Sequence, residues 1–226
     1  MSNKILLVMA TSMEADSLRK KNEMQAIPDG FKFANFELSL LITGVGSVAT
    51  AWTMTKWISS NEKPYLAINA GIAGSYRQDI KIGDVVMPVT DCFADAGIDS
   101  GKGFLTLGEA GLEDPDSFPF KNGKIIAGNR FVAEASKVVK SANAITVNTS
   151  TGSSENIEKL VNKFNPDIET MEGATFFYIC SRGNIPFLAL RSISNMVEPR
   201  NKENWQITLA LENLSEKLKE VLLLFD

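Results

Sequence analysis

The sequence predicts an α/β fold in which a central mixed β-sheet is flanked by helices. Apolar runs of strand length alternate with amphipathic segments of helical length along the chain. The 226 residues, of which 44% are hydrophobic and 22% charged, have the composition of a globular domain. No repeat, low-complexity tract or linker divides the chain, so we expect a single domain over residues 1–226.

The first half of the chain is predicted to begin with a buried strand that leads into a helix. Ile5 to Ala10 is an apolar run, and Thr11 and Ser12 behind it are residue types that cap helix N-termini. Two short runs then indicate a β-hairpin pair that ends before a glycine-containing turn. The expected elements are a strand at 5–10, a helix from residue 13, strands at 31–33 and 37–43, a helix at 48–59, and strands at 65–70 and 84–89.

The second half begins with a long irregular segment, residues 95–122, which is rich in Gly, Pro and Asp and carries a short apolar piece at 104–107. Gly183 is placed to end one helix, and a leucine stripe marks the buried face of the last one. The expected elements are a helix at 129–141, a strand at 144–148, helices at 154–164 and 172–182, a strand at 186–194 and a helix at 202–225.

Charge and hydropathy exclude several classes of partner. The net charge is -4 and no long basic run occurs, which argues against nucleic acid or an anionic membrane surface as the main partner. The apolar runs are far shorter than the roughly 20 residues that span a bilayer. No signal-peptide pattern precedes the first strand, and the two cysteines are expected to be reduced thiols, so we expect a cytoplasmic protein.

The chain contains no histidine. This absence excludes a Ser-His or Cys-His nucleophile, a histidine base and a His-ligated zinc site. Acid–base chemistry must then rest on Asp, Glu, Lys or Tyr, or be replaced by hydrogen bonding. We expect neither a metal nor an organic cofactor.

Three predicted strands end in small or polar residues, at 44–46, 69–74 and 192–195. Ligands of open α/β sheets lie beyond the carboxyl ends of the strands, so these segments are candidates for a binding site. Gly44 and Gly46 lack the third glycine of a dinucleotide-binding fingerprint, which argues against a nicotinamide cofactor.

Taken together and in order, several motifs resemble the nucleoside phosphorylase/nucleosidase superfamily over nearly the whole chain. They are Met13-Glu14, Thr43-Gly44-Val45-Gly46, Asn69-Ala70-Gly71-Ile72-Ala73-Gly74, Ile82-Gly83-Asp84-Val85-Val86, Glu169-Thr170-Met171-Glu172-Gly173-Ala174 and Arg191-Ser192-Ile193-Ser194-Asn195. Residues 103–107 with 114–120, and residues 194–201, look closest to the futalosine hydrolases. The resemblance implies a three-layer phosphorylase/hydrolase-like fold and hydrolysis of the N-glycosidic bond of futalosine in menaquinone biosynthesis.

The resemblance also implies roles for two carboxylates. Glu172, beside Met171, matches the residue that grips the ribose diol, and Glu14 matches the residue that activates the attacking water. Each is also a plausible first-turn glutamate of a helix, where the macrodipole favours negative charge. The first basic residue after Glu14 is Arg19, more than one turn away, which favours hydrolysis over phosphorolysis.

Asn195 stands where related nucleosidases for 6-amino purines have an Asp. An amide offers a donor and an acceptor, which suits a 6-oxo purine such as hypoxanthine. A turn or cap asparagine is the alternative reading. Arg191 is expected to orient Glu14, the water or the sugar, or to form an interior ion pair.

The remaining candidates concern the other parts of the substrate. Gly44, Ala73, Gly74 and Ser194 are expected to line the substrate, and Phe104 or another aromatic of the 95–122 segment to stack on the base. Thr149 to Ser154 match a segment that contacts the base in relatives. Asp95 falls near a family loop, and Arg77 and Arg200 are candidates for the carboxylate on the 5′ side of futalosine; for all three, a solvated surface residue is the alternative.

Several functions stay open at this point. A methylthioadenosine/adenosylhomocysteine nucleosidase is the nearest alternative, followed by a purine nucleoside phosphorylase and by a nucleoside-binding protein without activity. The partner implied in each case is a small nucleoside, and relatives of this superfamily are homo-oligomers.

Overall fold

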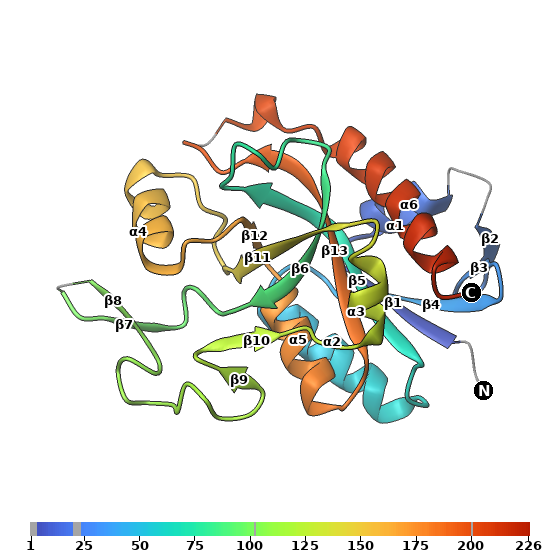
Figure 1. The fold of residues 1–226 in the computed structure, drawn as a ribbon, viewed down its shortest axis with the longest axis horizontal. Helices are drawn as coiled ribbons and strands as arrows, with labels where there is room; N and C mark the ends of the chain where they lie inside the picture. Colours follow the sequence, from blue (N-terminus) through green and yellow to red (C-terminus); the bar gives the residue numbers. More distant parts are fainter. Residues whose placement is uncertain (1–3, 20–23, 102, 200) are drawn as a thin grey trace.

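The computed structural model describes residues 4–19, 24–101, 103–199 and 201–226 (Figure 1). Its strands are β1 (Lys4–Met9), β2 (Gln25–Ile27), β3 (Gly30–Phe33), β4 (Phe36–Ile42), β5 (Leu66–Ser75), β6 (Val85–Asp91), β7 (Gly97–Asp99), β8 (Phe104–Thr106), β9 (Phe120–Lys121), β10 (Lys124–Ile126), β11 (Lys140–Thr146), β12 (Ile168–Thr170) and β13 (Phe187–Met196). Its helices are α1 (Ser12–Arg19), α2 (Ser47–Ser60), α3 (Arg130–Ala135), α4 (Ser154–Phe164), α5 (Gly173–Arg182) and α6 (Ile207–Leu223), with a 3-10 turn at Lys202–Asn204.

Within these described residues, 11 strands form one mixed sheet, and β7 and β8 form a separate antiparallel pair. Parallel pairings join β4, β1, β5 and β13, whereas β13 pairs with β6 in the antiparallel sense. Strands β5, β12, β11, β6 and β13 pair in a closed ring. Half of the sheet is therefore closed on itself like a small barrel, which the alternation of strands and helices does not predict.

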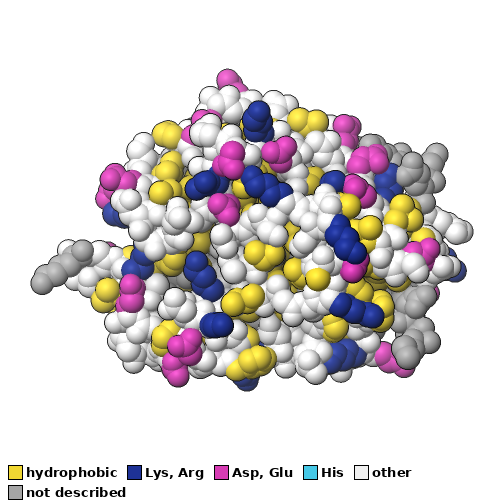
Figure 2. Space-filling model, viewed as in Figure 1, with side chains coloured by type: hydrophobic (Ala, Val, Ile, Leu, Met, Phe, Trp, Pro, Cys, Tyr) yellow, Lys and Arg dark blue, Asp and Glu magenta, His cyan; other side chains and the backbone are white. Residues whose placement is uncertain are grey.

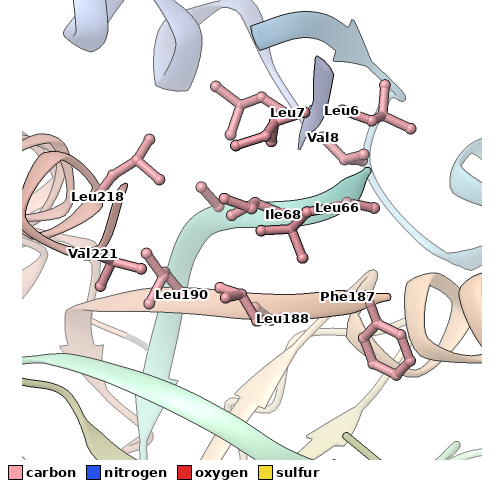
Figure 3. Packing of buried hydrophobic residues seen from close by; sticks show 14 of the residues in the cluster. Leu6, Leu7, Val8, Leu66, Ile68, Phe187, Leu188, Leu190, Leu218 and Val221 are labelled. Carbon is pink, nitrogen blue, oxygen red and sulfur yellow. The ribbon is translucent and has the colours of Figure 1, made fainter. Parts of the chain in front are cut away.

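Helices cover the sheet on two sides, so the predicted α/β fold with a central mixed sheet is confirmed. In Figure 1, α1 and α6 lie above the strands, and α2 and α5 lie side by side below them. The strands between are apolar on both faces: five of the six residues of β1 are buried, as expected for a parallel strand covered twice. Figure 3 shows Leu218 and Val221 of α6 facing Leu190 of β13 in this core.

Three predicted boundaries are wrong. The helix expected from residue 202 begins at Ile207, after a separate 3-10 turn at Lys202–Asn204. The helix expected over 129–141 ends at Ala135, and residues from Lys140 already belong to β11. The strand expected to stop at Ala70 continues as β5 to Ser75, because β13 and β12 pair with its second half. Strand β12 was not predicted, and the irregular 95–122 segment contains the β7–β8 pair.

Basic and acidic side chains are interspersed over the face seen in Figure 2. In the part of the chain that the structure describes, none of the helices combines the length and apolarity needed to cross a membrane.

Candidate active site

Glu14 is held at the carboxyl end of β1 by a capping box. Thr11 Oγ1 accepts from the Glu14 backbone N–H at 3.3 Å, and Glu14 Oε2 accepts in return from Thr11 N at 2.9 Å and Thr11 Oγ1 at 3.1 Å. The other carboxylate oxygen, Oε1, accepts from Ile72 N of β5 at 3.3 Å. The side chain is 5% exposed. Glu14 thus both caps α1 and turns one oxygen away from the helix towards the middle of the sheet.

Arg191 is a buried cation on the same side of Gly71 as Glu14. It is 1% exposed, and its Nη1 donates to the carbonyl oxygens of Asn69 at 2.9 Å and Leu190 at 3.1 Å, while Nη2 donates to Asn69 Oδ1. A Cβ atom on Gly71 would lie 2.8 Å from Glu14 Oε1 and 3.7 Å from Arg191 Nη1, so the two side chains flank the same glycine. Burial lowers the pKa of Arg191, and the charges of Glu172, Glu14 and Asp91 oppose that effect.

Glu172 is the N-terminal flanking residue of α5 and approaches the turn between β4 and α2. Its Oε1 accepts from Gly46 N at 2.8 Å. Gly46 has a φ of 90°, a conformation that favours glycine and that turns its N–H towards the carboxylate. Burial raises the pKa of Glu172, whereas the Gly46 hydrogen bond and Arg191 lower it and the charge of Glu14 raises it. The structure therefore brings Glu14, Arg191 and Glu172 into one electrostatic group.

Asn195 lies near the end of β13 with its amide in a fixed orientation. Nδ2 donates to Met196 O at 2.9 Å, and Oδ1 accepts from Ser194 Oγ at 2.8 Å. Since the Met196 carbonyl can only accept, the nitrogen must face it, and one N–H and one lone pair stay available. The Ser194 hydroxyl also lies 3.3 Å from the carbonyl oxygen of Ala73, which places Ala73 and Ser194 beside the amide.

Glu169 is a second polar side chain beside Asn195, and we did not predict it as a site residue. Glu169 of β12 is buried, and both it and Asn195 are register partners of Gly74. A Cβ atom on Gly74 would lie 3.2 Å from Asn195 Nδ2 and 3.6 Å from Glu169 Cγ. Both side chains therefore occupy the same face of the sheet, over the space that Gly74 leaves free.

The carboxylate of Glu169 joins two neighbouring segments. Oε2 accepts from the Tyr76 hydroxyl at 2.6 Å, and Oε1 accepts from Thr151 N at 3.0 Å. Burial, and after it the charge of Glu169, raise the pKa of Tyr76, which keeps its phenol as a donor. Glu169 fixes the loop after β11 beside Asn195. A glutamate inside the short motif around Met171 was the sequence signal for it.

Phe104 lies apart from the carboxylate group. It lines a cavity of about 300 Å³ together with Asp95 and residues of the 149–152 loop. Its ring centroid lies 6.4 Å from that of Phe164, and Lys163 Nζ lies 5.7 Å from its centre. Phe104 and the 149–152 loop, which we expected to contact the base, therefore line the same cavity.

The other predicted residues fall in different places. Met171 is half-buried in the turn before Glu172, and Gly44 donates its N–H to the Ala10 carbonyl at 3.0 Å. Asp95 accepts two hydrogen bonds from Asn148. Arg77 lies 3.4 Å from an Asp79 oxygen and 3.7 Å from an Asp167 oxygen, so carboxylates of the chain itself already face it. Arg200 lies outside the described residues.

No group of three or more metal-ligating side chains forms among residues 4–19, 24–101, 103–199 and 201–226. The site offers two carboxylates whose charges act on one buried guanidinium, and an amide and a third carboxylate on strands β13 and β12 beside Gly74. Paired carboxylates of this kind can activate water and stabilise positive charge on a sugar.

Two relatives among known proteins carry the names of purine nucleosidases. A 5′-methylthioadenosine/S-adenosylhomocysteine nucleosidase of Buchnera aphidicola is 27% identical over 84% of this chain and 80% of its own length. A futalosine hydrolase of Streptomyces coelicolor is 26% identical over 94% of this chain and 92% of its own.

Among solved structures, the fold matches a Helicobacter pylori methylthioadenosine nucleosidase mutant, with a TM-score of 0.79, 22% identity and coverage of 98% and 99% of the two chains. The futalosine hydrolase of Helicobacter pylori matches with a TM-score of 0.77, 22% identity and 97% coverage of each chain. The model of the family described as the phosphorylase superfamily matches residues 4–225, and the chain therefore belongs to the phosphorylase superfamily.

Proposed function

We propose that this chain hydrolyses the N-glycosidic bond of futalosine, releasing hypoxanthine and dehypoxanthine futalosine in the futalosine pathway of menaquinone biosynthesis. Relatives with similar identity are named futalosine hydrolase and methylthioadenosine/adenosylhomocysteine nucleosidase, and both names describe hydrolysis of a purine nucleoside. The shared activity supports a nucleosidase. The choice of futalosine depends on the base side of the site.

The observation that carries this choice is that the Asn195 amide and the Glu169 carboxylate lie on the same side of Gly74. A 6-oxo purine presents acceptors at O6 and N7 and a donor at N1–H, whereas adenine presents an amino donor and an N1 lone pair. The free N–H of Asn195 suits O6, and its oxygen lone pair suits a protonated N7. Glu169 adds an acceptor that attracts N1–H and repels a lone pair at N1. Together they favour hypoxanthine.

The two other carboxylates fit the sugar side of the same reaction. Glu172 accepts from the ribose hydroxyls and, as an anion, stabilises the positive charge that develops on the sugar. Glu14 takes a proton from the water that attacks C1′. The C1′–N9 bond breaks with its electron pair on the base, whose N7 has taken a proton from solvent. The water oxygen bonds to C1′, and the proton that Glu14 takes from the water returns to solvent.

The environment of Arg191 favours water over phosphate as the nucleophile. Phosphorolysis needs cations that face a phosphate beside the sugar. Arg191 acts on both Glu14 and Glu172, but its guanidinium is buried and donates to Asn69 and Leu190. The positive charge of Arg191 partly compensates the negative charges of the two carboxylates. Because the guanidinium is buried, it does not offer hydrogen bonds to an anionic nucleophile.

A methylthioadenosine/adenosylhomocysteine nucleosidase is the second candidate, because relatives with that name are as similar to the chain as the futalosine hydrolase is. The test incubates the protein with futalosine, inosine and methylthioadenosine, with and without phosphate, and follows release of free base. We expect hypoxanthine release that does not depend on phosphate. Phosphate-dependent turnover would support a phosphorylase, and binding without turnover would support a nucleoside-binding protein.

We also infer a cytoplasmic homo-oligomer in which this one domain is the subunit. Val45, Val48 and Trp52 lie at spacings of three and four residues around the start of α2, and they are 55%, 82% and 71% exposed. Met13, at the start of α1, is 56% exposed. Val45 and Met13 directly precede Gly46 and Glu14 of the candidate site, and exposed apolar side chains beside a site are typical of a contact between subunits.

A further inference from the structure

Asp91, at the end of β6, is a fully buried carboxyl group for which the proposed mechanism has no use. Its Oδ1 accepts from Cys92 N at 2.8 Å and from Thr146 Oγ1 at 3.0 Å, whereas its Oδ2 is buried and has no hydrogen-bond partner among the residues that the structure describes. An ionisable group in such a place costs folding free energy. Its surroundings connect it with the start of α5.

The first connection runs through Thr146 to helix α5. Thr146 Oγ1 accepts from Ala174 N at 2.7 Å, and its single hydrogen is given to Asp91. Asp91 thus directs the hydroxyl so that a lone pair faces the first turn of α5. In the same turn, Gly173 N donates a hydrogen bond to Thr170 Oγ1 at 3.1 Å. These bonds fix the backbone immediately after Glu172.

The second connection is direct contact with the same turn. A Cβ atom on Gly173 would lie only 2.2 Å from Asp91 Oδ2 and 3.3 Å from its Cγ, so the carboxyl group packs on the backbone that follows Glu172. The presence of glycine at this position is what admits the buried carboxyl group.

The third connection is electrostatic. Arg191 of β13 stabilises the charged form of Asp91, and Glu172 at the start of α5 opposes it. The charge of Asp91 raises the pKa of the neighbouring Cys92, and the charge of Lys124 on β10 lowers it. Glu14 and Glu172 share Arg191 with Asp91.

We propose that Asp91 is a positioning residue, which holds Glu172 in place through Thr146 and Gly173 and shares Arg191 with the two proposed catalytic carboxylates. The proposal rests on the proposed function, because Glu172 is taken to bind the sugar. Burial, the largest effect, raises the pKa of Asp91 to about 7, so the group changes charge in the range where the enzyme is assayed.

The test compares Asp91→Asn with the wild type on whichever purine nucleoside the wild type cleaves best. We expect kcat to fall roughly tenfold or more with KM within about twofold, because a misplaced Glu172 weakens the transition state more than the bound substrate. The kcat/KM profile of the wild type should contain an ionisation near pH 7 that the variant lacks. Asp29→Asn, an exposed aspartate in the turn between β2 and β3, is the matched control and should keep the wild-type kcat and the ionisation.

A second pair of variants keeps the proposal falsifiable if Asp91→Asn does not fold. Thr146→Val removes the connecting hydroxyl and should lower kcat and speed amide exchange at Ala174, whereas Thr146→Ser should restore both. Unchanged kcat and pH profile in a folded Asp91→Asn, or equal behaviour of the two Thr146 variants, would overturn the proposal. A wild type without glycosidase activity would instead contradict the proposed function, and amide exchange at Ala174 would still test the role of Thr146.

Discussion

Glu169 and Asn195 lie on the same face of the sheet, on the two strands that flank Gly74. One offers a carboxylate that only accepts hydrogen bonds, and the other offers an amide that both donates and accepts. Because donor and acceptor patterns distinguish one purine from another, this pair is the feature from which we derive the choice of base.

Glu169→Gln should weaken discrimination between bases. An amide at this position can donate to an N1 lone pair, so the ratio of kcat/KM for a 6-oxo over a 6-amino nucleoside should fall about tenfold, which corresponds to about 1.4 kcal/mol. The assay compares inosine with adenosine. Tyr76→Phe is the matched control, since it removes a donor to Glu169 and leaves the acceptor in place. An equal loss in both variants would show that Glu169 only anchors the loop.

Glu14→Gln should abolish most turnover, by roughly 10²- to 10⁴-fold in kcat, because the amide cannot take a proton from water. Stability should change little, since glutamine serves as well as glutamate in a capping box with Thr11. Thermal unfolding and substrate binding are the accompanying measurements. A variant with near wild-type kcat would remove Glu14 from the mechanism.

Activity should fall as pH decreases at a point above the usual range of a glutamate. Burial raises the pKa of Glu172, so its carboxylate is protonated at a higher pH than in a free chain, and the protonated form cannot stabilise a cationic sugar. We expect the part of the acidic limb that belongs to Glu172, as distinct from the Asp91 ionisation near pH 7, to disappear in Glu172→Gln, together with selectivity for ribosides over 2′-deoxyribosides. An acidic limb that persists unchanged would assign it to another group.

Trp52→Glu should convert the oligomer into monomers. A charge at a side chain that is 71% exposed in one chain costs little there but is unfavourable inside an apolar contact. Light scattering at several concentrations measures the mass. Val161→Glu, on α4 and 37% exposed, is the control and should leave the mass unchanged. A wild type that is monomeric at all concentrations would contradict the inferred assembly.

The elements with strong local signals could be predicted from the sequence. Helix α4 begins and ends where expected, because Ser153 caps its N-terminus and Asn165 takes the left-handed conformation at its end. Helix α5 likewise begins and ends within a residue of the prediction. Glu14, Glu172 and Asn195 were candidates because their motifs occur in order, and the structure adds what holds each of them.

What the sequence does not predict depends on contacts between distant strands. Strand β12 has three residues, one of them Glu169, and it exists because β5 and β11 pair with it on either side. Residues from Lys140 join β11 through pairing with β6, although their pattern continues that of a helix. Asp91 has no recognisable motif, since its importance arises only where β6, β11 and α5 meet.

The most direct test of the central claim is the ratio of kcat/KM for futalosine to that for methylthioadenosine, measured by release of free base without phosphate. We predict that hypoxanthine is released from futalosine far faster than adenine is released from methylthioadenosine. Release of adenine from methylthioadenosine, with futalosine left intact, would contradict it.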